Sequence, residues 1–365
     1  MMKMTRLCVL FGGRSPEHDV SCMSVVSVIG AIDRSKYELT TIGITKDGRW
    51  LIYDGPVEKI SDGSWQEYAE KKLAEEPEKY GFSVLAANGR GLKDMTDFVL
   101  PIVHGPYCED GKLQGLLEMA DVPYGGCGVT ASAVAMDKII AKQVFESAGL
   151  PVTKYTYVTT ADIADDLDAC LDQIEKAVGY PAFIKPANMG SSVGISKASD
   201  RDELKAALDL ASRHDRRILC EEAVDCREIE TGVLGNDDVK VTVPGEIVAT
   251  EDFYDYDSKY VDDGKPKMQI PANIPEETSE KLRDIAARAY RAIDGSGFAR
   301  CDFFVDRKTG SIYINEINTL PGFTAFSMFP LLWEAAGSPY SSTIERIIEL
   351  GYERYNDKTD RTSDK

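Results

Sequence analysis

The chain of 365 residues is long enough to bury a large core and to form two or three domains. Its 61 acidic residues against 42 basic ones give a formal charge of −19 at pH 7, which argues against nucleic acid or an anionic membrane as a partner. The first residues lack the apolar run of a signal peptide, and no apolar stretch approaches the length of a membrane span, so we expect a cytoplasmic protein.

An apolar strand at Leu7–Phe11 runs into a glycine turn and then into a helical segment that ends at Ile32. In this layout the amides of a helix N-terminus can meet a small anion or substrate. The G-x-G-x-x-G pattern is absent, so a dinucleotide-binding fold is only weakly indicated. Glu17 lies where the helix begins, and it either contacts a ligand or complements the helix dipole.

We expect the segments Glu38–Ile44 and Phe98–Val103 to join the first strand in a parallel sheet. His104 follows the third strand directly, at its carboxyl end. Ligands bind along that edge of open α/β sheets, so His104 is a candidate binding residue. The Gly-rich turn Gly125–Gly128 then predicts the first domain boundary.

The central part of the chain combines two helices with a glycine-rich loop. One helix is expected to include Met136–Lys142 and to end near Gly149–Pro151, and a second is expected over Ala161–Val178. A strand that ends at Lys185 is followed by the loop Gly190–Gly194, which has little side-chain bulk and many N–H and hydroxyl donors. A loop that covers phosphate needs such donors, with a lysine on the strand behind it. The loop is not a Walker A sequence, and a plain β-hairpin turn is the alternative.

A strand at Arg217–Glu222 leads into a segment suited to nucleotide binding. The strand-edge backbone of Glu222–Val224 would read the flat edge of a purine, and Glu228 would bind a ribose hydroxyl. The segment Asp252–Tyr260 alternates aromatic and polar residues and predicts a long loop that closes over a site, although an ordinary strand fits the same spacing. A helix over Glu276–Ile293 follows.

A hairpin is predicted near the C-terminus, from the strands Cys301–Asp306 and Ser311–Asn318. Gly310 can take the left-handed conformation that a three-residue hairpin turn requires. If Arg307 and Ser311 flank this turn, residues whose numbers add up to 618 face each other.

This register pairs Asp302 with Glu316 and Arg300 with Asn318. Like charges across a sheet repel, so the pairing needs something to offset it. Two carboxylates and an amide oxygen are hard ligands that suit Mg²⁺ sharing phosphate oxygens, and they do not suit zinc. The break at Thr319–Phe323 would expose backbone N–H groups beside the metal. The alternative is a solvated hairpin face with a slipped register.

Seven pieces of the chain together carry a family resemblance: FGGRSPEHDVS, HGPYCEDGKLQG, MDK, FIKPANMGSSVGI, FYDYDSKY, ARCDFF and INEINTLPGFT. In the order and spacing of these pieces, the chain resembles the D-alanine:D-alanine ligases of the ATP-grasp superfamily. Seven matches in series, over almost the whole length, are specific. The resemblance implies an α/β (α+β) ATP-grasp fold with ATP between two antiparallel sheets. The implied domains are an N-terminal substrate domain at 1–125 and two ATP-grasp subdomains at 126–221 and 222–365.

The resemblance also implies a role for each matched residue. The residues implied to contact ATP are Lys138, Lys185, Glu221, Glu222, Val224, Glu228 and Lys259. The implied ligands of two Mg²⁺ (or Mn²⁺) ions are Asp302, Glu316 and Asn318. The residues implied for the first D-alanine are Glu17, His104, Ser191 and Tyr260. Those implied for the oxyanion and the second D-alanine are Arg300, Gly322, Ser327 and Met328.

The implied activity is the ATP-dependent joining of two D-alanines through an acyl phosphate, for peptidoglycan synthesis, by a homodimer. Cys108 and Phe326 depart from the family pattern, in which glycine and histidine are usual. A D-alanine:D-serine ligase of the glycopeptide-resistance type is therefore an alternative, as is a nucleotide-binding regulator without catalysis. The pair Lys259–Tyr260 and the apolar Met328 favour D-alanine as the second substrate.

Overall fold

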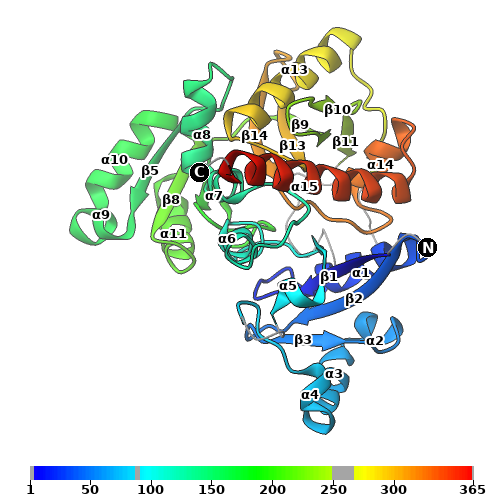
Figure 1. The fold of residues 1–365 in the computed structure, drawn as a ribbon. Helices are drawn as coiled ribbons and strands as arrows, with labels where there is room; N and C mark the ends of the chain where they lie inside the picture. The colour runs from blue at the N-terminus through cyan, green and yellow to red at the C-terminus, as the bar shows by residue number, and fades with distance from the viewer. Residues whose placement is uncertain (1–3, 87–90, 249–266, 364–365) are drawn as a thin grey trace.

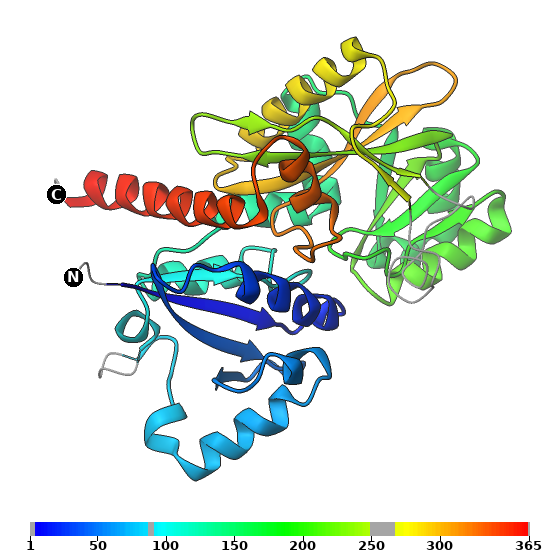
Figure 2. The same cartoon turned by 90° about the vertical axis from the view of Figure 1, so that its right-hand side faces the viewer.

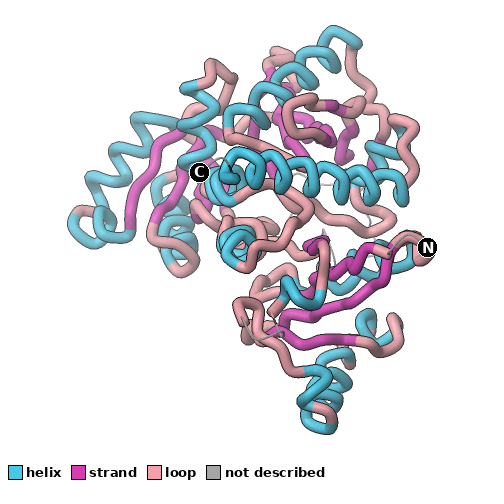
Figure 3. The backbone as a smooth tube through the Cα atoms, in the orientation of Figure 1, coloured by secondary structure: helices cyan, strands magenta, loops and turns pink. Residues whose placement is uncertain are grey.

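The structure, a computed structural model, describes residues 4–86, 91–248 and 267–363, and its strands form three sheets (Figure 1). Helices flank each sheet (Figure 3). The predicted loop Asp252–Tyr260, with Lys259 and Tyr260, lies outside the described residues. No helix in the described part of the chain is long and apolar enough to cross a lipid bilayer.

The N-terminal sheet has the strand order β3-β2-β1-β4. Its strands are β1 (Thr5–Gly12), β2 (Tyr37–Ile44), β3 (Trp50–Tyr53) and β4 (Phe98–Pro101). β1 pairs in parallel with both β2 and β4, which confirms the predicted parallel sheet, and β3 adds an antiparallel edge. The apolar run Leu7–Phe11 is buried on both faces of the sheet, as is usual for parallel strands. The helices of this part are α1 (His18–Ala31), α2 (Glu58–Ser61), α3 (Trp65–Glu75), α4 (Pro77–Tyr80), α5 (Leu92–Met95) and α6 (Lys112–Met119).

The second sheet is antiparallel throughout, in the order β5-β8-β6-β7. Its strands are β5 (Tyr155–Thr159), β6 (Ala182–Pro186), β7 (Ser196–Ala198) and β8 (Arg217–Glu222). The helices beside it are α9 (Thr160–Asp165), α10 (Leu167–Val178) and α11 (Arg201–Ser212). The predicted glycine-rich loop connects β6 to β7, so it is a hairpin loop that spans an antiparallel pair.

The third sheet is also antiparallel, in the order β12-β11-β9-β13-β14, with β10 paired to β9. Its strands are β9 (Cys226–Leu234), β10 (Lys240–Val241), β11 (Gly245–Val248), β12 (Lys267–Gln269), β13 (Phe298–Asp306) and β14 (Ile312–Asn318). Its core also takes in α7 (Val129–Met136), α8 (Lys138–Ser147) and α13 (Glu276–Ala292). The helix predicted over Glu276–Ile293 is thereby confirmed.

Two predicted helices are each broken at an aspartate. A single helix that runs from Met136 through Asp137 toward Gly149 is wrong at its start, because Asp137 is extended and its carboxylate accepts two N–H groups of the turn that begins α8, while α8 ends at Ser147, close to the predicted end. A single helix over Ala161–Val178 is wrong for the same reason, since the Asp166 carboxylate caps α10. An aspartate at such a position satisfies N–H groups that a continuous helix would pair with carbonyls.

The C-terminal helix α15 (Tyr340–Ser363) lies between the N-terminal sheet and the third sheet (Figures 1 and 2). It follows α14 (Met328–Ala335) and extends beyond both ends of the predicted helix Thr343–Glu353. One apolar cluster contains Phe98 of β4, Ile347 of α15 and Phe298 of β13. The helix therefore joins the core of the N-terminal sheet to that of the third sheet.

Gly351 allows α15 to approach the N-terminal sheet closely. A Cβ at this position would lie 2.5 Å from the backbone oxygen of Tyr124 and 2.6 Å from the Phe98 ring. We expect Gly351→Ala to lower the free energy of unfolding by about 1–3 kcal/mol, because overpacking strains a rigid contact. Urea denaturation would measure the change.

Gly30→Ala is the matched control, because Gly30 also lies in a helix and no atom lies within 4 Å of its missing Cβ. Alanine there should raise the stability by about 0.5–1 kcal/mol through helix propensity. Equal effects of the two substitutions would contradict close packing at Gly351.

Candidate active site

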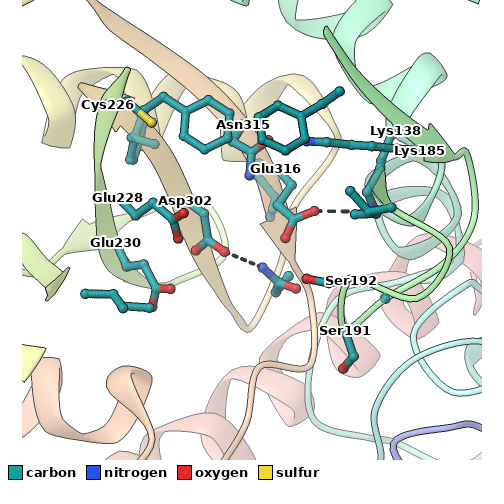
Figure 4. Close-up of a pocket in the computed structure, with 18 of the residues that line it drawn as sticks. Lys138, Lys185, Ser191, Ser192, Cys226, Glu228, Glu230, Asp302, Asn315 and Glu316 are labelled. Carbon is teal, nitrogen blue, oxygen red and sulfur yellow. Dashed lines mark hydrogen bonds and ion pairs between the residues drawn. The ribbon is translucent and has the colours of Figure 1, made fainter. Parts of the chain in front are cut away.

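A cavity of about 950 Å³ opens between the second and third sheets. Glu17 and Glu109, from the N-terminal sheet and its helices (the N-terminal unit), also line it. Many of the predicted site residues line it together: Glu17, Lys138, Lys185, Ser191, Glu222, Val224, Glu228, Arg300, Asp302, Glu316 and Asn318. Figure 4 shows carboxylates of β9, β13 and β14 on one side and the lysines and the glycine-rich loop on the other. Of the predicted residues that the structure describes, the others lie outside this lining: His104, Glu221, Gly322, Ser327 and Met328.

The predicted hairpin register is confirmed for the residue pairs that line the cavity. Asp302 pairs with Glu316, and Arg300 pairs with Asn318. The predicted flanks of the turn are wrong, because the Asp306 N–H donates to the Ser311 carbonyl at 2.9 Å.

A bulge explains how the register is nevertheless correct. Between Asp302 and Phe303 the register shifts, and Phe303 pairs with Ile314, which leaves Asn315 as the extra residue of β14. Gly310 has the predicted left-handed conformation, with φ 70°. The bulge therefore compensates for the longer turn before the strands reach the cavity.

The Asp302 carboxylate accepts hydrogen bonds from two neighbouring side chains. Its two oxygens accept hydrogen bonds from Arg300 Nε and Nη2, each at 2.7 Å, and from Asn318 Nδ2 at 2.8 Å. Glu316 lies 3.5 Å from Lys138 Nζ (Figure 4). Burial opposes the charge of Arg300, but the carboxylates of Asp302, Glu230 and Glu316 together outweigh it and raise the pKa of the guanidinium.

The chemistry of these donors fits a hard divalent cation. Asp302 and Glu316 offer carboxylate oxygens, and Asn318 offers an amide oxygen, which are the ligands that Mg²⁺ prefers. The described residues contain no group of three or more His, Cys, Asp or Glu side chains that could hold a metal ion alone. Such a site would be completed by waters and phosphate oxygens, which is usual for Mg²⁺.

A buried ion cluster lies behind the lysine side of the cavity. The Glu221 carboxylate is 1% exposed, forms ion pairs with Lys142 at 2.9 Å and with Lys185, and accepts a hydrogen bond from Thr153. Burial opposes ionisation of Glu221, but the two lysines outweigh it and hold the pKa of its carboxyl far below its usual range. Lys142 is not among the predicted site residues, although it follows Lys138 at helical spacing.

Glu17 presents a carboxylate oxygen to the cavity. Ser191 Oγ donates to Glu17 Oε1 at 2.5 Å, whereas Oε2 is buried and has no hydrogen-bond partner among the described residues. Cβ atoms at Gly105 and Gly190 would lie 2.4 and 2.8 Å from Oε2. Both glycines thus make room for the carboxylate, and an ammonium group would satisfy its second oxygen.

The loop that carries Ser191 has an unusual backbone. Ser191 and Ser192 have φ values of 49° and 59°, a region that residues other than glycine rarely adopt. Lys138 Nζ donates to the Met189 carbonyl at 2.7 Å, so the lysine also contacts the base of this loop. Strained backbone of this kind is concentrated at ligand-binding sites.

His104 holds the turn after β14 in place. Its Nδ1 lies 2.8 Å from the Leu320 carbonyl, which can only accept, so Nδ1 donates and Nε2 accepts from Ser24 Oγ at 3.2 Å. Burial lowers the pKa of His104, which keeps the imidazole neutral. The Phe323 N–H in turn donates to Ser24 at 3.4 Å. In this structure His104 therefore positions the backbone on both sides of Gly322.

The segment beyond this turn begins α14. Ser327 is the residue before the helix, and its Oγ accepts the Thr324 N–H at 3.0 Å. A Cβ on Gly322 would lie 3.1 Å from the same oxygen, so the two predicted residues are neighbours. Met328 is 2% exposed, and its sulfur packs against Gly245 of β11.

Glu109 lines the cavity but is not among the residues predicted from the sequence. Its carboxylate accepts the Gly105 N–H at 2.8 Å and the Leu320 N–H at 3.3 Å, and so joins the N-terminal unit to the turn after β14. Burial, and then repulsion by Glu17, raises the pKa of Glu109 to about 8. Its signal was an acidic residue within the HGPYCEDGKLQG piece, five residues after His104.

Two family profiles cover most of the chain. The one described as D-ala D-ala ligase N-terminus matches residues 6–127, and the one described as D-ala D-ala ligase C-terminus matches residues 144–349. A curated D-alanine–D-alanine ligase from Acetivibrio thermocellus is 48% identical, over 96% of this chain and 97% of that one.

Two solved structures are similar in fold as well as sequence. The VanG D-Ala:D-Ser ligase from Enterococcus faecalis has a TM-score of 0.84 at 34% identity, over 96% of this chain and 100% of that chain. The D-alanine-D-alanine ligase from Coxiella burnetii has a TM-score of 0.83 at 31% identity, over 99% of this chain and 97% of that chain.

The two antiparallel sheets around a cavity, together with these neighbours, define an ATP-dependent ligase of the ATP-grasp fold, which confirms the predicted fold class. More particularly, the chain belongs to the D-alanine–D-alanine ligase family.

The raised pKa of Glu109 predicts a pH-dependent stability. The folded protein keeps a proton on Glu109 up to about pH 8, whereas the unfolded chain releases it near the ordinary pKa of about 4.3. The contribution of Glu109 to the free energy of unfolding is therefore fully present below its ordinary pKa. It is lost as the pH rises from there toward 8.

Glu109→Gln should remove this pH dependence. Between pH 5.5 and 8, the free energy of unfolding of the variant relative to the wild type should therefore rise by up to about 1.4 kcal/mol per pH unit. Urea denaturation of both proteins at several pH values would measure the difference. A difference that stays constant over this range would show that Glu109 is not protonated in the folded protein.

Proposed function

We propose that this protein joins two D-alanines to D-alanyl-D-alanine, with ATP converted to ADP and phosphate, for peptidoglycan synthesis in the cytoplasm. The observation that carries the proposal is the content of one cavity. It combines a carboxylate oxygen of Glu17 that has no partner in the described part of the chain, the lysines Lys138 and Lys185, and the acidic pair Asp302 and Glu316. The 48% identity to a curated D-alanine–D-alanine ligase supports the same conclusion.

The reaction has two steps because a carboxylate is a poor electrophile. Transfer of the γ-phosphoryl group of ATP to the first D-alanine carboxylate forms an acyl phosphate and releases ADP. The amine of the second D-alanine then attacks the acyl carbon, loses a proton, and displaces phosphate as the peptide bond forms. Asp302, Glu316 and Asn318 would hold Mg²⁺ or Mn²⁺, which would supply positive charge that screens the phosphates.

The chain's own residues bind the substrates and stabilise charge. Glu17, held by Ser191, receives the ammonium of the first D-alanine, with His104 supporting that side. Arg300 and the Gly322 N–H stabilise the oxyanion of the tetrahedral intermediate. The remaining assignments are Ser327 and Met328 for the second D-alanine, Tyr260 for the closed loop, and Lys138, Lys185, Glu221, Glu222, Val224, Glu228 and Lys259 for ATP.

The second substrate is the point on which the relatives differ. The neighbour with TM-score 0.84 is described as a D-Ala:D-Ser ligase, at 34% identity. The curated relative at 48% identity is described as a D-alanine–D-alanine ligase, and it favours D-alanine. Phe326, which departs from the family pattern beside Ser327, is 70% exposed.

We also propose a homodimer and three domains at 1–125, 126–221 and 222–365.

The function is tested by phosphate release from ATP and Mg²⁺ with D-alanine alone, then with D-serine or D-lactate added, and with products identified by mass. We expect the D-alanine dipeptide, little altered by the competitors. A mixed product would indicate a D-alanine:D-serine ligase. ATP binding without any turnover would indicate a regulatory protein.

Glu316→Gln should weaken ADP binding in the presence of Mg²⁺ by at least about 10-fold, since even outer partners of a metal site contribute that much. Without Mg²⁺ the two proteins should bind ADP alike. Calorimetric titration would measure both affinities. Glu345→Gln is the control, because Glu345 pairs with Lys36 at 2.7 Å outside the cavity lining. Unchanged Mg²⁺ dependence in Glu316→Gln would exclude a metal at this carboxylate.

A further inference from the structure

Three carboxylates form one row across the sheet. Asp302 of β13 stands opposite Glu230 of β9 on one side and opposite Glu316 of β14 on the other. All three line the cavity, and Glu230 and Asp302 lie beside each other in Figure 4. Glu230 is 5% exposed and Asp302 is 8% exposed. Like charges in such a row repel, so a buried cation must offset them.

Arg300 is that cation, and two carboxylates share it. Its Nε and Nη2 donate to Asp302, while Nε also lies 3.0 Å from Glu230 Oε2. Nε carries a single N–H, which is directed at Asp302 Oδ1. Glu230 therefore contacts the guanidinium mainly through charge, at a distance that allows a hydrogen bond if Asp302 turns away.

A metal ion at Asp302 would compete with Arg300 for the same oxygens. Both Asp302 oxygens accept hydrogen bonds from Arg300 at 2.7 Å, so coordination requires some of these bonds to break. The guanidinium stays charged at any ordinary pH and cannot remain buried without a partner. Glu230 is already within reach of it.

Resting on the proposed function, we infer that Glu230 is a positioning residue that retains Arg300 in the cavity when Asp302 coordinates Mg²⁺. The exchange frees Asp302 for the metal and keeps the guanidinium beside the reacting carbonyl. Loss of the Glu230 charge would leave Asp302 as the one carboxylate among the described residues that forms an ion pair with Arg300. The metal would then compete with a stronger ion pair, and the guanidinium would be displaced whenever the metal binds.

Glu230→Gln tests this inference in the full-length protein. Mn²⁺ binding in the presence of ADP, followed by electron paramagnetic resonance, should weaken about 10-fold, as is typical when a partner of a metal ligand is lost. The rate constant kcat should fall by a similar factor, about 10-fold, while KM for D-alanine changes little. Glu230→Asp keeps the charge but shortens the side chain by one methylene. It should therefore lower Mn²⁺ affinity and kcat by smaller factors than Glu230→Gln.

Glu246→Gln is the matched control. Glu246 pairs with Arg227 at 2.5 Å in the same sheet, with side-chain exposures of 9% and 23%, against 7% and 20% for Glu230 and Arg300. Neither Glu246 nor Arg227 lines the cavity. This variant should lose a comparable amount of thermal stability yet keep wild-type Mn²⁺ affinity and kcat.

The outcomes separate the inference from the function on which it rests. Wild-type Mn²⁺ affinity and kcat in both Glu230 variants would overturn the positioning role. Equal losses in Glu230→Gln and Glu246→Gln would also overturn it, because they would reflect only the removal of a buried ion pair. Failure of the wild type to form the dipeptide would count against the proposed function, while Mn²⁺ binding does not depend on turnover.

Discussion

Repulsion between carboxylates that the sheet register brings together is the constraint on which the site depends. Pairing of β13 with both β9 and β14 aligns Glu230, Asp302 and Glu316 in one row. Desolvated like charges are tolerated only with counter-charges nearby, and Arg300 and Lys138 supply them in this structure. The acidic side of the cavity is thus held by contacts that the proposed metal would have to replace.

The same balance explains how a chain with a formal charge of −19 can bind an anionic nucleotide. Two lysines flank the buried Glu221, so this small region keeps a net positive charge within an acidic protein. Lys185 lines the cavity, whereas Lys142 is 1% exposed and lies behind it. Attraction from Glu221 outweighs the burial that would otherwise lower the pKa of Lys185, so this lysine stays charged where phosphate would bind.

Close backbone approach is the second requirement of the site. The Glu17 carboxylate fits only because Gly105 and Gly190 have no Cβ atoms, and Ser191 reaches it from a left-handed backbone. Glu109 and His104 then attach the turn after β14 to the N-terminal unit. The contacts of Ser191 with Glu17 and of His104 and Glu109 with Leu320 join residues 174 to 216 positions apart, which makes the cavity a product of all three sheets.

Local patterns in the sequence determined the strands, most helices and the hairpin pairing, because apolar periodicity and glycine turns act over a few residues. The pairing of Asp302 with Glu316 followed from the hairpin even though its turn was assigned wrongly, since a bulge restored the register. Only tertiary structure decided the partners of these residues. Glu109, Glu230 and Lys142 acquire their roles from side chains on distant strands and helices. No local pattern encodes such contacts, because burial and charge partners exist only once the sheets have packed together.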